Sequence, residues 1–129
     1  MNDCRSAIEA CGLDPQIGFL HVVRPGRAAL ALDLMEEFRA FADRLVLSLI
    51  NRGQIGAADF VEREGGAVLL EGEARKAVLV AYQERKQDKL THPLLSETVP
   101  LGVLPHLQAR LLARTLRGDT AEYLPYLTR

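Results

Sequence analysis

The sequence has 129 residues, of which 48% are hydrophobic and 26% are charged. This length fits one domain, and this composition excludes a disordered or low-complexity chain. The 16 Lys and Arg against 17 Asp and Glu leave a formal net charge of −1. That balance excludes nucleic-acid binding through total charge and leaves a local basic patch open. With 5% aromatic residues and no Trp, a base-stacking surface is not expected.

The two cysteines, Cys4 and Cys11, are predicted to stay reduced. If they share a helix they are separated by about 10 Å of rise, which is too far for a disulfide. The N-terminal stretch MNDCRSAIEA has neither the basic nor the apolar region of a secretory signal, and no apolar run approaches the roughly 20 residues of a membrane span. The sequence therefore predicts a cytoplasmic protein with no membrane partner.

Glycine and proline divide the chain into predicted elements. The first helix begins at a cap, Asn2 or Asp3, and runs to about Cys11. The connector 12–27, GLDPQIGFLHVVRPGR, is long and apolar at its centre. A connector of this kind is too apolar to be disordered, so we expect it to pack against the protein and to carry His21 with it.

The strongest helical pattern runs without a break over residues 28–52 and ends at Gly53. Its apolar stripe recurs at helical spacing and consists of Leu30, Leu34, Phe38, Phe41, Leu45 and Leu49. Asp33, Glu36 and Glu37 fall in its first two turns, where the helix dipole favours acids.

Three further elements are predicted after this helix. GAADFVEREGGAVLLEG indicates a short helix and one strand of a small hairpin, and a third long helix covers about residues 71–90 before the break at His92-Pro93. A fourth helix covers about residues 101–117, and the partly apolar tail DTAEYLPYLTR is expected to dock. The predicted fold class is all-α, mainly a helical bundle with one short β-hairpin, in a single domain 1–129.

Two groups of residues suggest chemistry near the connector. His21 is followed by a basic turn with Arg24 and Arg27. The acidic face consists of Asp33, Glu36 and Glu37, because Glu36 and Glu37 each share a helix side with Asp33. Imidazole and carboxylate ligands suit a divalent cation, and arginines suit a phosphate. Such a cation supports phosphodiester chemistry by generating a nucleophile or steadying an oxygen.

Each of these residues also has an ordinary structural explanation, and the pattern leaves both open. The acids complement a helix dipole, a lone His in a loop is commonly structural or exposed, and arginines in a turn are commonly solvated. A basic set on the third long helix is interleaved with acids, which predicts a salt-bridged face; it consists of Arg75, Lys76, Arg85, Lys86 and Lys89. His92 and His106 are expected to be caps or surface groups.

The string GLDPQIGFLHVVRPGRAALALDLMEEFR, residues 12–39, closely resembles the CRISPR-associated endonuclease and integrase of CRISPR adaptation, Cas-one, in its type I-like version. Further matches follow in order along the chain: RLVLSLINRGQI, AYQERK, the His92-Pro93 step, QARLLARTLRGD and YLPYL. The resemblance covers essentially the whole chain and implies the C-terminal helical, catalytic-type domain of that family.

The resemblance implies a function in spacer acquisition. The family inserts foreign DNA segments into the CRISPR array with a small partner, Cas-two, through a metal-dependent transesterification in which a 3′-hydroxyl attacks a repeat-boundary phosphodiester. A related endonuclease activity cuts DNA by the same chemistry. The full-length family protein forms a homodimer through an N-terminal β-rich domain.

The same resemblance implies roles for particular residues. The His that ends the GFLH motif, here His21, and the acid one turn after the Asp of DLMEE, here Glu36, correspond to metal ligands for Mg²⁺ or Mn²⁺. Asp33 is the second candidate acid for catalysis and metal binding. Arg27 and Arg24 correspond to the basic turn that faces DNA phosphate, and Lys76 is a further DNA-binding candidate.

One part of the family pattern does not occur in the sequence. The family's first ligand, a Glu in a glycine-flanked motif, lies upstream of the helix that leads into GLDP, and no such motif precedes that helix here. We therefore expect a fragment that lacks the N-terminal β-rich domain, with weak metal binding. The alternative is a catalytically inactive helical module that acts as a DNA- or protein-binding scaffold.

Overall fold

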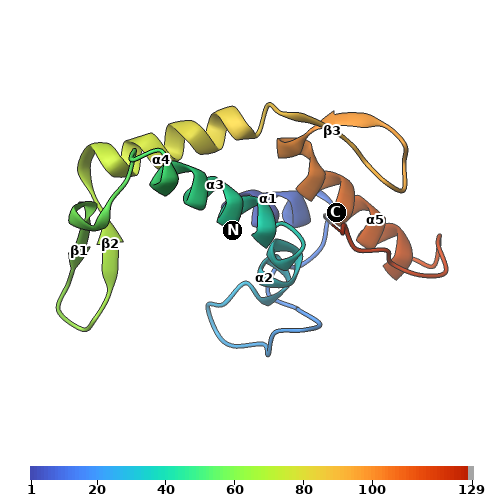
Figure 1. Cartoon of the computed structure of the whole chain (residues 1–129). Coiled ribbons are helices and arrows are strands. Elements are labelled where there is room, and N and C mark those ends of the chain that lie inside the picture. The colour runs from blue at the N-terminus through green and yellow to red at the C-terminus, as the bar shows by residue number, and fades with distance from the viewer. Residues whose placement is uncertain (128–129) are drawn as a thin grey trace.

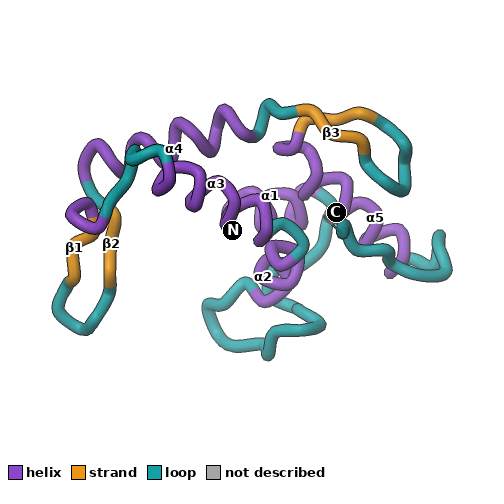
Figure 2. The backbone as a smooth tube through the Cα atoms, in the orientation of Figure 1, coloured by secondary structure: helices purple, strands orange, loops and turns teal. Residues whose placement is uncertain are grey.

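The computed structural model describes residues 1–127, so the last two residues of the predicted domain lie outside the described part. Within residues 1–127 the chain forms five α-helices, two short 3₁₀ helices and two antiparallel hairpins. Figure 2 shows how helices, strands and loops follow one another along the backbone. The helices are α1 (Asn2–Ala10), α2 (Ala29–Glu36), α3 (Arg39–Asn51), α4 (Gly72–Arg85) and α5 (Leu104–Leu116). The strands are β1 (Phe60–Glu62), β2 (Val68–Leu70), β3 (Lys89–Thr91) and β4 (Thr98–Pro100). The predicted mainly helical fold class is confirmed.

The main hydrophobic core lies between α1, α2 and α5, which we call the three-helix core. Its buried side chains are Cys4, Ala7, Ile8, Leu30, Ala31, Leu34, Ala109 and Leu112. Both cysteines are free, and burial raises the pKa of the Cys4 thiol to about 11. Cys4 is therefore a packing residue and not a nucleophile.

The helices α3 and α4 lie side by side and extend away from this core, with the β1–β2 hairpin beyond their far end (Figure 1). We call α3, α4 and this hairpin the arm. Its own core is small and consists of Leu49, Ile55 and Ala74. Strand β1 pairs with β2 in antiparallel register, as predicted for this segment. Within residues 1–127 no helix combines the length and the apolar character needed to cross a membrane.

The predicted unbroken helix over residues 28–52 is wrong, because the chain breaks between α2 and α3 at Glu37 and Phe38. No glycine or proline marks this position. The Glu37 carboxylate instead leaves the helix surface to accept hydrogen bonds from Gln108 Nε2 (2.7 Å), the Tyr126 backbone N–H (2.7 Å) and the Tyr123 hydroxyl. The hydrogen bonds to these distant residues favour a break in the helix that the local helix propensity does not predict.

The second hairpin, β3–β4, also differs from the sequence prediction. The helix α4 ends at Arg85, and the segment predicted to continue it turns back through β3 and β4 in antiparallel register. The turn contains His92, which was predicted to be a cap or a surface group. It is 1% exposed, so the surface role is wrong, and its local hydrogen bonds are those of a cap. Its Nδ1 accepts the backbone N–H of Leu94 and Leu95, and its Nε2 lies 3.0 Å from Gln108 Oε1. The imidazole therefore organises a buried polar network that no periodic pattern predicts.

The connector between α1 and α2 is exposed rather than packed (Figure 2). Its apolar side chains Phe19, Leu20 and Val22 are 65%, 77% and 72% exposed, so the prediction that this segment packs down is wrong. Only its start contributes to the apolar packing, where Leu13 lies against the three-helix core. The Pro15 carbonyl accepts the backbone N–H of Leu30 at 2.9 Å and thereby caps the start of α2, which has no side-chain cap.

Candidate active site

The buried carboxylate of Asp33 is the centre of the candidate site. Asp33 lies on α2, and its side chain turns toward the connector. Oδ2 accepts the backbone N–H of Phe19 at 2.5 Å and of Leu20 at 3.0 Å, while Oδ1 accepts the backbone N–H of His21 at 3.0 Å. Burial alone would raise the pKa of Asp33, but these hydrogen bonds and the one from the His21 ring hold it below its ordinary value.

The His21 imidazole is the second group of the site. Its Nδ1 lies 2.6 Å from Asp33 Oδ1, and the side chain is 28% exposed. Within residues 1–127 the other ring nitrogen, Nε2, has no hydrogen-bond partner. The connector thus brings His21 to an acid on the next helix, and that acid is Asp33, whereas the sequence ranked Glu36 first.

Glycine at position 18 allows the connector to approach α2 closely. A Cβ built on Gly18 would lie 2.8 Å from Asp33 Oδ2 and 2.8 Å from Ala29 Cβ. Real Cβ contacts are essentially never this short, so any other residue at position 18 would push the connector away from α2. The GFLH string therefore starts with the one residue type that fits this approach.

Glu36 lies one turn after Asp33, at the C-terminal end of α2, and it is exposed. Its carboxylate pairs with the Arg39 guanidinium through Nε at 2.8 Å and Nη2 at 2.5 Å. This pairing is the main cause that lowers the pKa of Glu36, and the nearby His21 lowers it further. Glu36 does not complement the dipole of its own helix, since α2 ends there; it precedes the N-terminus of α3 instead.

The chain does not by itself gather three metal ligands. Within the described residues no group of three or more His, Cys, Asp and Glu side chains is arranged to hold a metal ion. Within residues 1–127 the Nε2 atom of His21 has no hydrogen-bond partner, and the exposed carboxylate of Glu36 is paired with Arg39. The prediction that His21, Glu36 and Asp33 bind a divalent metal stays a prediction.

The predicted phosphate contacts fall into two separate places. Arg24 and Arg27 lie exposed in the connector, and the Arg24 carbonyl closes their turn by accepting the backbone N–H of Arg27 at 3.0 Å. Lys76 lies on α4 in the arm, with its Nζ 3.7 Å from Glu73. The arm and the connector occupy different parts of the molecule in Figure 1, so Lys76 does not extend the patch of Arg24 and Arg27.

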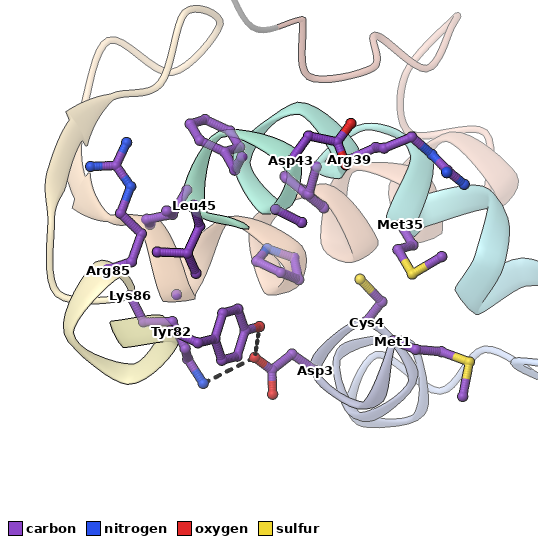
Figure 3. Close-up of a pocket in the computed structure, with 16 residues that line it drawn as sticks. Met1, Asp3, Cys4, Met35, Arg39, Asp43, Leu45, Tyr82, Arg85 and Lys86 are labelled. Carbon is purple, nitrogen blue, oxygen red and sulfur yellow. Dashed lines mark hydrogen bonds and ion pairs between the residues drawn. The ribbon is translucent and has the colours of Figure 1, made fainter. Parts of the chain in front are cut away.

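A separate cavity of about 300 Å³ opens between α1, α3, α4 and the start of α5 (Figure 3). Apolar side chains such as Met35, Phe38 and Leu45 line much of it. At its edge Asp3 Oδ2 accepts a hydrogen bond from the Tyr82 hydroxyl at 2.6 Å and an ion pair from Lys86 Nζ at 3.0 Å. None of His21, Asp33 and Glu36 lines this cavity, so it is not part of the candidate site.

Solved structures with the same fold define the class of protein. The chain superposes on a casposase bound to integration product with a TM-score of 0.85 at 27% identity, over 96% of this chain and 36% of the casposase. A Cas1 protein from Thermotoga maritima gives a TM-score of 0.79 at 30% identity, over 91% and 36%. A partial Cas6-RT-Cas1–Cas2 complex gives 0.72 at 25% identity, over 95% and 36%. The fold is that of the helical domain shared by Cas1 proteins and a casposase.

Sequence comparison gives the family. The family model described as CRISPR associated protein Cas1 matches residues 1–84, so this chain belongs to the Cas1 family. It is 65% identical to the CRISPR-associated endonuclease Cas1 1 of Moorella thermoacetica, over 100% of this chain and 38% of that protein. It is 61% identical to the CRISPR-associated endonuclease Cas1 2 of Rhodospirillum rubrum, over 97% and 37%. The chain thus spans less than two fifths of these relatives, and the predicted family resemblance is confirmed.

Proposed function

We propose that this chain carries part of the active site of a CRISPR adaptation nuclease, which cuts DNA and joins it by phosphodiester transesterification. One observation carries the proposal: Asp33 holds the His21 ring with Nε2 unpartnered within residues 1–127, close enough to the exposed Glu36 carboxylate to lower its pKa. The endonuclease names of the relatives and the integration product in the casposase structure support this function.

The donor set fits a divalent cation. One imidazole nitrogen and one carboxylate are suitable ligands for Mn²⁺, and less so for Mg²⁺, which prefers oxygen. His21 and Glu36 would hold the ion, with Asp33 as the acid beside them. When bound, such an ion supplies charge that stabilises the attacking and leaving oxygens of a phosphodiester. The third ligand that the resemblance implies, an upstream Glu, does not come from these residues.

The residues of this chain perform two further tasks in the proposal. Arg24 and Arg27 are exposed next to His21 and would bind the DNA backbone as phosphate contacts. Arg39 pairs with Glu36 and keeps that carboxylate ionised, which is the state a cation needs. DNA and a small Cas2-type partner are proposed for the longer protein, supported by the casposase and the Cas1–Cas2 complex. The cytoplasmic location and the homodimer stay predictions.

A metal titration tests the proposal. Mn²⁺ is expected to raise the melting temperature of the chain in a concentration-dependent way, because a ligand of the native state adds RT ln(1 + [L]/Kd) to its stability. His21→Ala should abolish this rise. His106→Ala, which removes an exposed histidine from α5, is the matched control and should retain it. A rise that persists in His21→Ala, or no rise at all, contradicts the proposal.

DNA cutting by the chain alone is expected to be small, since two ligands hold a metal ion less firmly than three. Branched DNA incubated with the chain and Mn²⁺ is the measurement. Metal-dependent cutting that disappears in Glu36→Gln would show that two ligands suffice and would contradict this expectation.

The absence of a three-ligand cluster within the described residues favours a second function, an inactive helical scaffold that binds DNA or protein. The salt dependence of DNA binding distinguishes a scaffold that binds DNA from a chain that makes no phosphate contacts. If Arg27 contacts a phosphate, Arg27→Gln should reduce the slope of log K against log salt by about one. Arg110→Gln, an exposed arginine on α5, should leave the slope unchanged.

A further inference from the structure

We infer that Asp33 is a positioning residue rather than a metal ligand: its carboxylate fixes the backbone of residues 19–21 and holds the His21 ring in the tautomer with the proton on Nδ1. The use of the free Nε2 atom as a metal ligand rests on the proposed function. The arrangement itself does not, because it consists of hydrogen bonds within the chain.

The Asp33 carboxylate accepts as many hydrogen bonds as its two oxygens allow. An ionised carboxylate offers about four lone-pair sites on its two oxygens. Oδ2 accepts two backbone N–H groups, from Phe19 and Leu20. Oδ1 accepts the backbone N–H and the ring Nδ1–H of His21. The four donors occupy the four sites, so no lone pair of Asp33 is left for a metal ion.

Apart from Asp33, little holds residues 18–23 of the connector in place. Within the described residues, every hydrogen bond that positions 18–23 make ends on Asp33. Hydrophobic burial does not substitute for it, since Phe19 and Leu20 are 65% and 77% exposed. The position of His21 therefore depends on one carboxylate.

The hydrogen bond to Asp33 also determines which nitrogen of the His21 ring carries the proton. An ionised carboxylate only accepts hydrogen bonds, so the Nδ1 atom that lies 2.6 Å from it is the donor. In a neutral imidazole the other nitrogen then carries a lone pair. Nε2 of His21 is thus prepared to bind a cation, as in the carboxylate–histidine–metal arrangements of other proteins.

The chain contains its own spectroscopic reference. His92 has the opposite tautomer, because its Nδ1 accepts the backbone N–H of Leu94 and Leu95 and its Nε2 donates to Gln108 Oε1. His106 is exposed and is expected to sample both tautomers. The nitrogen shifts of three histidines, with ring proton couplings, therefore separate the three cases in one spectrum.

The experiment is nitrogen NMR of the ¹⁵N-histidine-labelled 129-residue chain, at a pH high enough for neutral rings and without metal. We expect a protonated Nδ1 for His21 and a protonated Nε2 for His92. In Asp33→Asn the Nδ1–H preference of His21 should be lost, because the amide no longer offers acceptors to all four donors. An unchanged His92 pattern in that variant shows that the fold is intact.

Gly18→Ala is the second variant, since it leaves the carboxylate in place and pushes the connector away from it. It should produce the same loss at His21. A wild-type His21 protonated on Nε2, or an Nδ1–H preference that survives in both variants, overturns the inference.

A metal titration of Asp33→Asn keeps the two proposals distinguishable. If the proposed function holds, the variant should bind Mn²⁺ about 10–100-fold more weakly, the effect expected when a partner behind a ligating His is lost. A clear Nδ1–H tautomer in a wild-type chain that binds no Mn²⁺ would overturn the proposed metal site and leave the positioning role of Asp33 standing. An unchanged Mn²⁺ affinity in a variant that has lost the tautomer would overturn the positioning role.

Discussion

The three-helix core and the arm use similar apolar residues with different results. In the core, Ile8 is 0% exposed and Leu34 is 3% exposed, because α1, α2 and α5 cover one another. In the arm, Leu47 on α3 and Leu79 on α4 are 57% and 53% exposed, since two helices cover only one face of each other. The same kind of sequence thus forms a closed core in one region and an open layer in the other.

This difference explains which region supports the candidate site. Asp33 lies on α2, a helix of the closed core, and local opening of a protein starts where few apolar contacts are buried. The carboxylate that positions His21 therefore rests on the better-packed region. The arm contributes Arg39, the first residue of α3, which pairs with Glu36.

The largest effect that tests this comparison is a matched pair of isoleucine substitutions. Ile8→Ala should lower the free energy of unfolding by about 2–5 kcal/mol, because it opens a cavity in the closed core. Ile50→Ala, on the arm, should cost less than about 1 kcal/mol, since Ile50 is 44% exposed. Urea denaturation followed by circular dichroism measures both. Equal losses would mean that the two regions do not differ in packing.

The second prediction concerns the junction between core and arm, where two adjacent acids have different surroundings. Glu37→Ala should cost about 1.5–3 kcal/mol, because Gln108, Tyr123 and Tyr126 lose the charged acceptor of their hydrogen bonds. Glu36→Ala removes only an exposed pair with Arg39 and should cost less than about 0.5 kcal/mol.

Trypsin cleavage after Arg117 adds a local measurement, because the tail beyond α5 docks through Tyr123 and Tyr126. Cleavage should become faster in Glu37→Ala and should not change in Glu36→Ala. A Glu37→Ala chain that is as stable and as resistant as the Glu36→Ala chain would show that the network does not hold the tail.

The elements that the sequence predicted well are those whose signals are local. The helix α1, the end of α5 at Leu116 and the β1–β2 hairpin all follow from spacing and turn residues within a few positions, and all are confirmed. The predicted cap of α1 at Asn2 or Asp3 is wrong, because Met1 occupies the N-cap and no side chain caps the helix. The helix break at Glu37 was missed because its partners lie 71 to 89 positions away. No pattern within residues 28–52 carries that information.

The sequence predicted which residues form the candidate site but not how they are arranged. The resemblance pointed to His21, Asp33 and Glu36, and the structure brings His21 onto Asp33. The roles of Asp33 and Glu36 depend on which of these two acids the connector reaches. That depends on three backbone N–H groups and on the close approach at Gly18, which side-chain types alone do not encode.

The smallest effect concerns the polar link between the two regions, where Asp3 on α1 meets Tyr82 and Lys86 at the end of the arm (Figure 3). Burial opposes ionisation of Asp3, but the hydrogen bonds from Tyr82 and Lys86 hold its pKa below the ordinary value of 3.8. A carboxyl group with a lowered pKa stabilises the fold above its unfolded pKa and loses that contribution as the pH falls through its folded pKa.

Asp3→Asn should therefore lower the free energy of unfolding by less than about 1 kcal/mol at neutral pH, as expected for a partly exposed ion pair. The difference from the wild type should close when the pH falls well below 3.8, because the wild-type carboxyl is then also uncharged. Asp43→Asn is the control, since Asp43 lines the same cavity but has no ion pair or side-chain hydrogen bond within residues 1–127. The midpoints of urea denaturation at both pH values measure this difference. A difference in stability between Asp3→Asn and the wild type that persists in acid would mean that Asp3 joins core and arm through packing and not through its charge.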